Sequence, residues 1–129
     1  MKEPEWVLRE VVFMLHEESL AQFGGSTGLR DEGLLDPALG RPRNHFACGK
    51  PTLFALTASY AFGLAKNHPF IDGNKRTAFL VAVAFLEING KRFVASEADA
   101  AVRTLALAAG EMTEAAFAAW IEANAKRSS

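Results

Sequence analysis

Residues 78–86 read Ala-Phe-Leu-Val-Ala-Val-Ala-Phe-Leu, nine consecutive residues without a polar side chain. A helix through this run has no polar face, and such a helix is normally the buried centre of a helical domain. It is expected to follow a turn at Gly73 and to run to Asn89, with Gly90 as its C-terminal stop. The run therefore predicts an all-α fold, a compact helical bundle around a central buried helix at about 74–89.

Apolar residues at helical spacing predict further helices on both sides of the central one, five or six in all. They are expected over about 5–22 with Pro4 in the first turn, from Leu29 to an interruption near Pro37, from a Thr52 cap to about His68, from a Ser96 cap to Gly110, and after a Thr113 cap. Ala98, Ala101, Val102 and Leu105 are expected to form the inner face of the helix after Ser96.

Two segments are expected to lack regular structure. The stretch between Gly40 and Pro51 is interpreted as a basic surface loop, since it carries cations between two prolines. The tail from Lys126 is expected to be frayed.

The length and the charge limit the classes of function. A chain of 129 residues predicts a single domain, 1–129. The net charge of -1 provides no global basic field, so neither direct nucleic-acid binding nor an anionic membrane surface is expected. The longest apolar run is far short of the roughly 20 residues that a membrane span needs. With no signal-peptide pattern and only Cys48, the chain is expected to be cytoplasmic.

A charged loop precedes the central helix and reads His68-Pro69-Phe70-Ile71-Asp72-Gly73-Asn74-Lys75-Arg76. A helix N-terminus presents free backbone N–H groups and a partial positive charge, which together bind anions. Gly73 lets a phosphate approach the backbone closely. Lys75 and Arg76 oppose the helix dipole, so an anion shared by all these groups explains them better than helix stability does. The loop predicts a phosphate-binding site.

Three other residues of the loop have candidate roles. Asp72 either caps the helix or binds Mg²⁺, because magnesium sites that handle nucleotides use one or two carboxylates. His68 is a candidate general base, since imidazole can accept a proton near neutral pH. Phe70 is interpreted as a core anchor that holds the loop.

The segment His68–Arg76 resembles the signature of the Fic/Doc proteins, H-x-F-x-(D/E)-(G/A)-N-(G/K)-R, and matches it at every position. Gly24-Gly25, the stretch from Gly28 to Leu35, and Leu86-Glu87-Ile88-Asn89-Gly90 are similar to the death-on-curing (Doc) toxin branch of type II toxin–antitoxin systems. The resemblance covers nearly the whole chain and implies a Fic/Doc-like helical domain.

The Doc branch has lysine at the position of Lys75, where Fic proteins that transfer AMP usually have glycine. The resemblance therefore implies a protein kinase-like phosphotransferase that moves the γ-phosphate of ATP to a Ser/Thr hydroxyl. The implied acceptor is elongation factor Tu, whose modification halts translation. His68 would be the general base, Asp72 would hold Mg²⁺, and the phosphates would contact the Gly73 backbone, Asn74, Lys75 and Arg76.

Regulation and alternative functions follow from the same resemblance. The inhibitory pattern (S/T)-x-x-x-E-(G/N) of many Fic proteins is absent, since the only Glu-Gly pair, Glu32-Gly33, is preceded at the required position by Gly28. A cognate, Phd-like antitoxin acting in trans is therefore implied. The alternatives are a Fic-type AMP transferase, which Lys75 disfavours, and a non-enzymatic antitoxin-binding relative, against which the intact motif argues.

Overall fold

A computed structural model describes residues 2–128, and its regular structure is almost entirely helical. The helices are α1 (Arg9–Phe23), α2 (Glu32–Cys48), α3 (Leu53–Asn67), α4 (Asn74–Ile88), α5 (Glu97–Ala109) and α6 (Glu114–Ala123). Two three-residue strands, β1 (Lys91–Phe93) and β2 (Ala125–Arg127), form a small antiparallel pair. The all-α expectation is confirmed.

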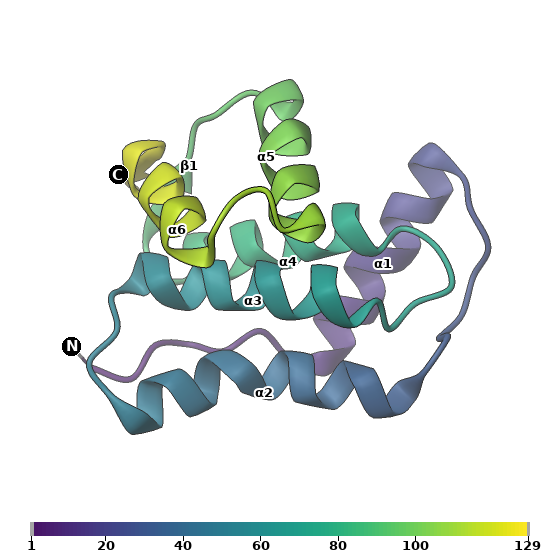
Figure 1. The fold of residues 1–129 in the computed structure, drawn as a ribbon, viewed down its shortest axis with the longest axis horizontal. Helices are drawn as coiled ribbons and strands as arrows, with labels where there is room; N and C mark the ends of the chain where they lie inside the picture. The colour runs from purple at the N-terminus through teal and green to yellow at the C-terminus, as the bar shows by residue number, and fades with distance from the viewer. Residues whose placement is uncertain (1, 129) are drawn as a thin grey trace.

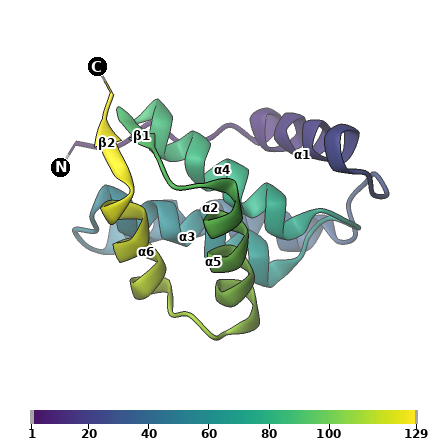
Figure 2. The ribbon, with the colours of Figure 1, turned by 90° about the horizontal axis from the view of Figure 1, so that it is seen from above.

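The helices α3 and α4 lie side by side at the centre of the molecule (Figures 1 and 2). Helix α2 packs against α3, helix α1 packs against α4, and both central helices contact α5, while α6 covers the remaining side of α3. The predicted central helix, 74–89, is therefore confirmed as α4 with an end one residue earlier. Helix α3 shares the centre and is equally buried, which the apolar run of α4 alone did not indicate.

Helix caps that depend on local sequence form as expected. The side chains of Thr52, Ser96 and Thr113 each accept a hydrogen bond from the backbone N–H three residues later. Each satisfies one of the N–H groups that a helix N-terminus leaves without an intrahelical partner.

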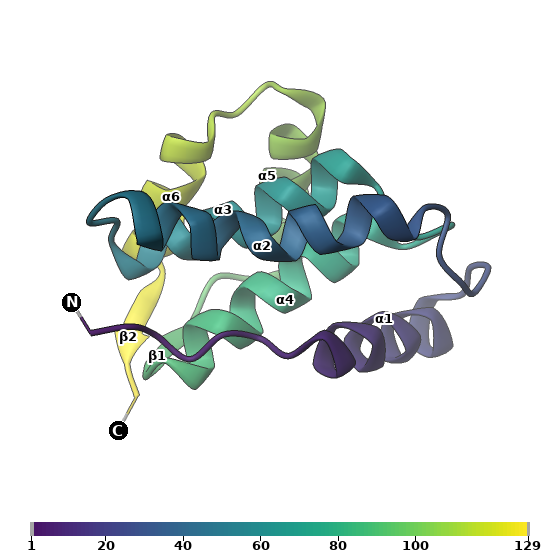
Figure 3. The ribbon, with the colours of Figure 1, turned by 90° about the horizontal axis from the view of Figure 1, so that it is seen from below.

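The first predicted helix begins too early, since α1 starts at Arg9 and the residues before it are extended. Figure 3 shows this segment running beside α4 to reach α1. Contacts with distant residues hold it there: Glu5 exchanges two backbone hydrogen bonds with the Asn89 side chain, and the Val7 N–H donates to the Tyr60 hydroxyl. The ring of Trp6 stacks on Phe85.

The interruption near Pro37 and the basic loop are both wrong, because α2 continues through Pro37 and Pro42 to Cys48. A proline inside a helix costs about 3 kcal/mol or more. Packing against α3 offsets this cost: Pro42 is buried, and Gly63 lets the two helices approach so closely that a Cβ there would lie 3.1 Å from the Ala38 carbonyl oxygen. Arg41, assigned to the loop, forms a bidentate ion pair with Glu114.

Two expectations about the C-terminal third are also wrong. The predicted inner face of α5 is exposed, with Val102 at 64% and Leu105 at 55%, while Ala100, Thr104 and Leu107 face the core. The tail pairs with β1 instead of fraying, and Lys126 lies opposite Arg92. The inner face of α5 depends on its packing against α3 and α4, and the order of the tail depends on its pairing with β1. Neither contact can be read from the local sequence.

Among residues 2–128, none of the helices has the length and apolar character that crossing a membrane requires.

Candidate functional site

The loop between α3 and α4 is clamped by the segment that follows α1. Leu29 forms an isolated β-bridge with Phe70, and the Ile71 N–H donates to the Gly28 carbonyl at 3.1 Å. The Arg30 side chain donates to the carbonyls of His68 at 2.8 Å and Asn67 at 3.0 Å, which closes the C-terminal end of α3. The loop is therefore fixed at several points of its backbone before any ligand binds.

Asn74 fixes the loop from the inside. Its side chain is buried, and its amide accepts from the Phe70 N–H at 2.9 Å and donates to the Phe70 carbonyl at 2.8 Å. The structure thus directs the Asn74 side chain into the loop, away from the phosphate contact expected of it. What Asn74 leaves for an anion is its backbone N–H at the start of α4.

The same amide determines the state of His68. The two bonds to Phe70 fix which atom of the amide is nitrogen, so an Asn74 N–H faces His68 Nδ1 at 3.1 Å. His68 Nδ1 must therefore accept, and the neutral ring holds its proton on Nε2. His68 itself is exposed and has left-handed backbone geometry, φ 54° and ψ 53°, as the C-cap of α3.

The N-terminus of α4 has the geometry of an anion site. Gly73 is left-handed, with φ 78°, and is followed by the right-handed helix, a combination that makes successive N–H groups converge. Within the described residues, the N–H groups of residues 73–76 donate no hydrogen bond; the first that does is that of Thr77, to the Gly73 carbonyl. Lys75 and Arg76 are exposed beside these N–H groups, and neither forms a salt bridge with any residue in 2–128. The four N–H groups and two cations can hold phosphate oxygens.

Asp72 lies directly before this anion site. Its Oδ2 accepts from the Ser26 N–H at 2.8 Å, and the side chain is exposed. No group of three or more possible metal ligands exists within residues 2–128. A single exposed carboxylate beside a phosphate site fits Mg²⁺, which takes most of its ligands from phosphate and water. The capping alternative is not observed, because α4 has no side-chain cap.

Phe70 and His16 connect the loop to helix α1. Phe70 is 1% exposed, and the His16 ring of α1 stacks on it at a centroid distance of 3.8 Å and an interplanar angle of 14°. His16 Nε2 lies 2.8 Å from the Asp72 carbonyl oxygen. The sequence gives no sign of this contact, because the two residues are 56 positions apart.

A groove begins beside the anion site and runs between α1, α4 and α5. It has a volume of about 520 Å³, and its apolar lining includes Leu15 and Phe23 of α1, Phe79 and Leu80 of α4, and Ala101 and Leu105 of α5. Lys75 and Arg76 also line it, and the Arg76 guanidinium lies 3.8 Å from the centroid of the Phe23 ring. An occupant of the groove would therefore contact the two cations of the anion site.

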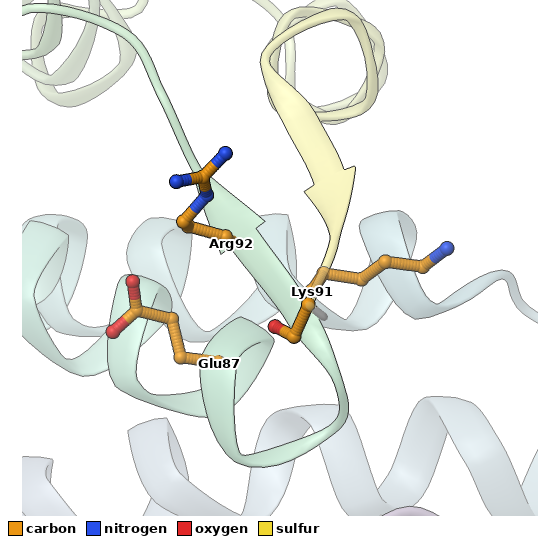
Figure 4. Close-up of a pocket in the computed structure, with 4 residues that line it drawn as sticks. Glu87, Lys91 and Arg92 are labelled. Atoms are coloured by element: carbon orange, nitrogen blue, oxygen red, sulfur yellow. The ribbon is translucent and has the colours of Figure 1, made fainter.

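A smaller hollow of about 210 Å³ lies at the opposite end of α4, lined by Glu87, Lys91, Arg92 and Ser128. In Figure 4 the Glu87 carboxylate and the Arg92 guanidinium lie on the same side of it. The hollow lies at the C-terminal end of α4, where the partial negative charge of the helix disfavours phosphate, so it is a poorer anion site than the N-terminus of α4.

Comparison with known proteins agrees with the motif. The family model described as the Fic/DOC family matches residues 6–86. A protein of Escherichia phage P1 named Protein kinase doc is 34% identical over 110 residues, which cover 84% of this chain and 86% of that protein. A protein of Mycolicibacterium smegmatis named Toxin Doc is 44% identical over 75 residues, covering 57% of this chain and 58% of that protein.

Proposed function

This chain belongs to the Fic/Doc family, and we propose that it is a Doc-like toxin that transfers the γ-phosphate of ATP to a Ser/Thr hydroxyl of a protein. The observation that carries the proposal is the N-terminus of α4, which has four free N–H groups and two exposed cations and whose Asn74 side chain contacts the His68 ring. The similarity to a protein named as a protein kinase supports transfer of phosphate.

The proposed reaction is an in-line displacement at the γ-phosphorus. The acceptor oxygen forms a new P–O bond, the bond from the γ-phosphorus to the oxygen that bridges to the β-phosphate breaks, and ADP leaves. The hydroxyl proton passes to His68. The N–H groups of residues 73–76, with Lys75 and Arg76, bind the phosphates and stabilise the charge that develops on them, which supplies most of the catalysis in phosphoryl transfer.

Asp72 is the residue that would hold Mg²⁺ in this proposal. The ion would neutralise phosphate charge when bound. The hydrogen bond from Ser26 N–H fixes the rotamer of the Asp72 carboxylate from the side of the Gly24–Gly28 loop. The free Oδ1 of the same carboxylate is then the atom available to a cation.

His68 must change its contacts before it can accept a proton. In the observed arrangement Nδ1 accepts from Asn74 and Nε2 carries the proton, so a neutral ring has no free lone pair. Turning the ring away from Asn74 gives up one hydrogen bond between neutral groups, worth about 0.5–1.5 kcal/mol. This free energy slows a reaction by little more than about tenfold. The loss is small beside the roughly 10²–10⁴-fold by which a positioned base raises the rate.

The proposed acceptor is elongation factor Tu, and the proposed regulator is a Phd-like antitoxin in trans. The groove between α1, α4 and α5 supports the second part. The exposed side chains of Glu18, Gln22 and Glu97 line it together with the apolar residues, so the groove offers polar contacts along with apolar surface. An antitoxin segment that folds in the groove would cover Lys75 and Arg76 and thereby block ATP.

Incubation with elongation factor Tu and ATP labelled at either the α- or the γ-phosphate tests the proposal. Label from the γ-position alone, lost in His68→Ala, is the expected result. Label from the α-position would instead identify an AMP transferase. Absence of label despite ATP binding would identify a non-enzymatic module.

A further inference from the structure

His16 is a buried titratable residue that the proposed mechanism does not use. It is 3% exposed on α1, and its Nε2 lies 2.8 Å from the carbonyl oxygen of Asp72. A carbonyl oxygen only accepts hydrogen bonds, so His16 Nε2 must carry a proton and donate it. Leu or Phe would fill this buried position without a polar atom, but neither could make this bond.

The contact fixes the orientation of one peptide group. The Asp72 carbonyl and the Gly73 N–H belong to the same peptide unit, which is planar and trans, since residues 2–128 contain no cis bond. In a trans peptide the C=O and N–H bonds point in opposite directions. Holding the oxygen toward α1 therefore directs the Gly73 N–H away from α1.

The Gly73 N–H is the first member of the anion site. The left-handed geometry of Gly73, followed by the right-handed Asn74, aligns this N–H with those that follow it. Gly73 also has close neighbours on the side of α1, because a Cβ there would lie 3.5 Å from Leu20 and 3.8 Å from the His16 ring. Helix α1 thus makes one polar contact with this peptide, through His16 Nε2, and its other contacts there are van der Waals contacts.

We infer that His16 is a positioning residue, whose Nε2–H holds the Asp72–Gly73 peptide so that the Gly73 N–H points at the bound phosphate. The inference rests on the phosphate site of the proposed function, but it does not depend on which group is transferred. The stacking on Phe70 fixes the plane of the His16 ring, so the N–H has one direction.

Two substitutions separate the hydrogen bond from the packing. His16→Phe keeps an aromatic ring against Phe70 and removes the donor, whereas His16→Gln keeps an N–H at a similar distance along the side chain. Phe13→Leu is the matched control, because the Phe13 ring also packs on Phe70, at 5.9 Å, and makes no polar contact with the loop.

Affinity for ATP and the backbone amide spectrum are the readouts. A hydrogen bond from a backbone N–H to a charged phosphate is worth about 10-fold to 100-fold in affinity. His16→Phe is therefore expected to weaken ATP binding by that factor. His16→Gln should restore most of the affinity, and Phe13→Leu should lower the melting temperature without changing the affinity. In the wild type, ATP should shift the Gly73 amide resonance strongly, and in His16→Phe much less.

The inference is overturned if His16→Phe binds ATP like the wild type, or if Phe13→Leu loses as much affinity as His16→Phe. Should His16→Phe fail to fold, the wild type alone decides: a Gly73 amide that saturating ATP or inorganic phosphate does not move also overturns it. A shifted Gly73 amide in a protein that transfers no phosphate would leave this inference standing and reject the proposed function.

Discussion

At the scale of single residues, the state of His68 depends on one neighbouring amide. The Asn74 N–H faces His68 Nδ1, so we predict that the free protein holds the neutral ring in the Nε2–H form. Nitrogen-15 spectra of the histidine rings check this directly, with His16 and His45 assigned by substitution. An Nδ1–H form of His68 in the free protein would contradict the hydrogen-bond assignment. Loss of the Asn74 contact on binding ATP and acceptor, seen as a shift of the Nδ1 resonance, is the expected sign of activation.

Tyr60 gives a pH-dependent prediction. Burial raises the pKa of its phenol above the ordinary 10.0, although the hydrogen bond from Val7 N–H and the charge of Arg43 both act to lower it. Below pH 10 both the folded and the unfolded chain keep the proton. Above it the unfolded chain releases the proton first, so the free energy of unfolding should fall as pH rises.

Tyr60 is the only tyrosine, so phenolate absorbance reports on it alone. The absorbance midpoint of the folded protein is expected above pH 10, and Tyr60→Phe should remove that part of the alkaline loss of stability. A midpoint at or below 10 in the folded protein would show that the phenol is not desolvated.

At the scale of elements, local sequence predicted the features that local contacts determine. The caps at Thr52, Ser96 and Thr113 and the start of α4 depend on residues three or four positions apart, and all are confirmed. The course of α2 through Pro37 depends on its packing against α3, and the start of α1 depends on contacts of the preceding segment with α3 and α4. No periodicity within those segments contains this information.

The ion pair between Arg41 and Glu114 should stabilise the packing of α2 and α6 on α3. It is bidentate, with both distances 2.7 Å, and both side chains are less than one-third exposed. We predict that Glu114→Gln lowers the free energy of unfolding by about 1–3 kcal/mol.

The control is Glu32→Gln, which removes a single contact with Arg9 between largely exposed side chains. Its effect should stay below about 1 kcal/mol. Urea unfolding of the two variants measures both values, and equal losses would mean that the partly buried pair contributes no more than a surface one.

At the scale of the whole molecule, the groove and the anion site form one continuous surface. Leu105 lines the groove from the exposed face of α5 and is far from the loop in sequence. We predict that Leu105→Glu abolishes neutralisation by the antitoxin while phosphate transfer is kept within about threefold, since surface substitutions away from a site change little. Transfer assays with and without antitoxin test this, and unchanged neutralisation would place the antitoxin elsewhere.

The candidate site was predictable to the extent that it is contiguous in sequence. His68, Asp72, Gly73, Lys75 and Arg76 lie together in one loop, and the charges at a helix N-terminus indicated the anion. The supporting residues were not predictable, because His16 and Ser26 reach Asp72 across 56 and 46 positions. The inward direction of the Asn74 side chain also depends on the folded loop.

Phosphoryl transfer by the loop His68–Arg76 is the activity that we propose for this protein. The intact mass of elongation factor Tu after incubation with the protein, ATP and Mg²⁺ tests it most directly, with His68→Ala in parallel. A gain of one phosphoryl group with the wild type and no gain with His68→Ala is the expected result. A gain of an adenylyl group, or equal phosphorylation by His68→Ala, would contradict it.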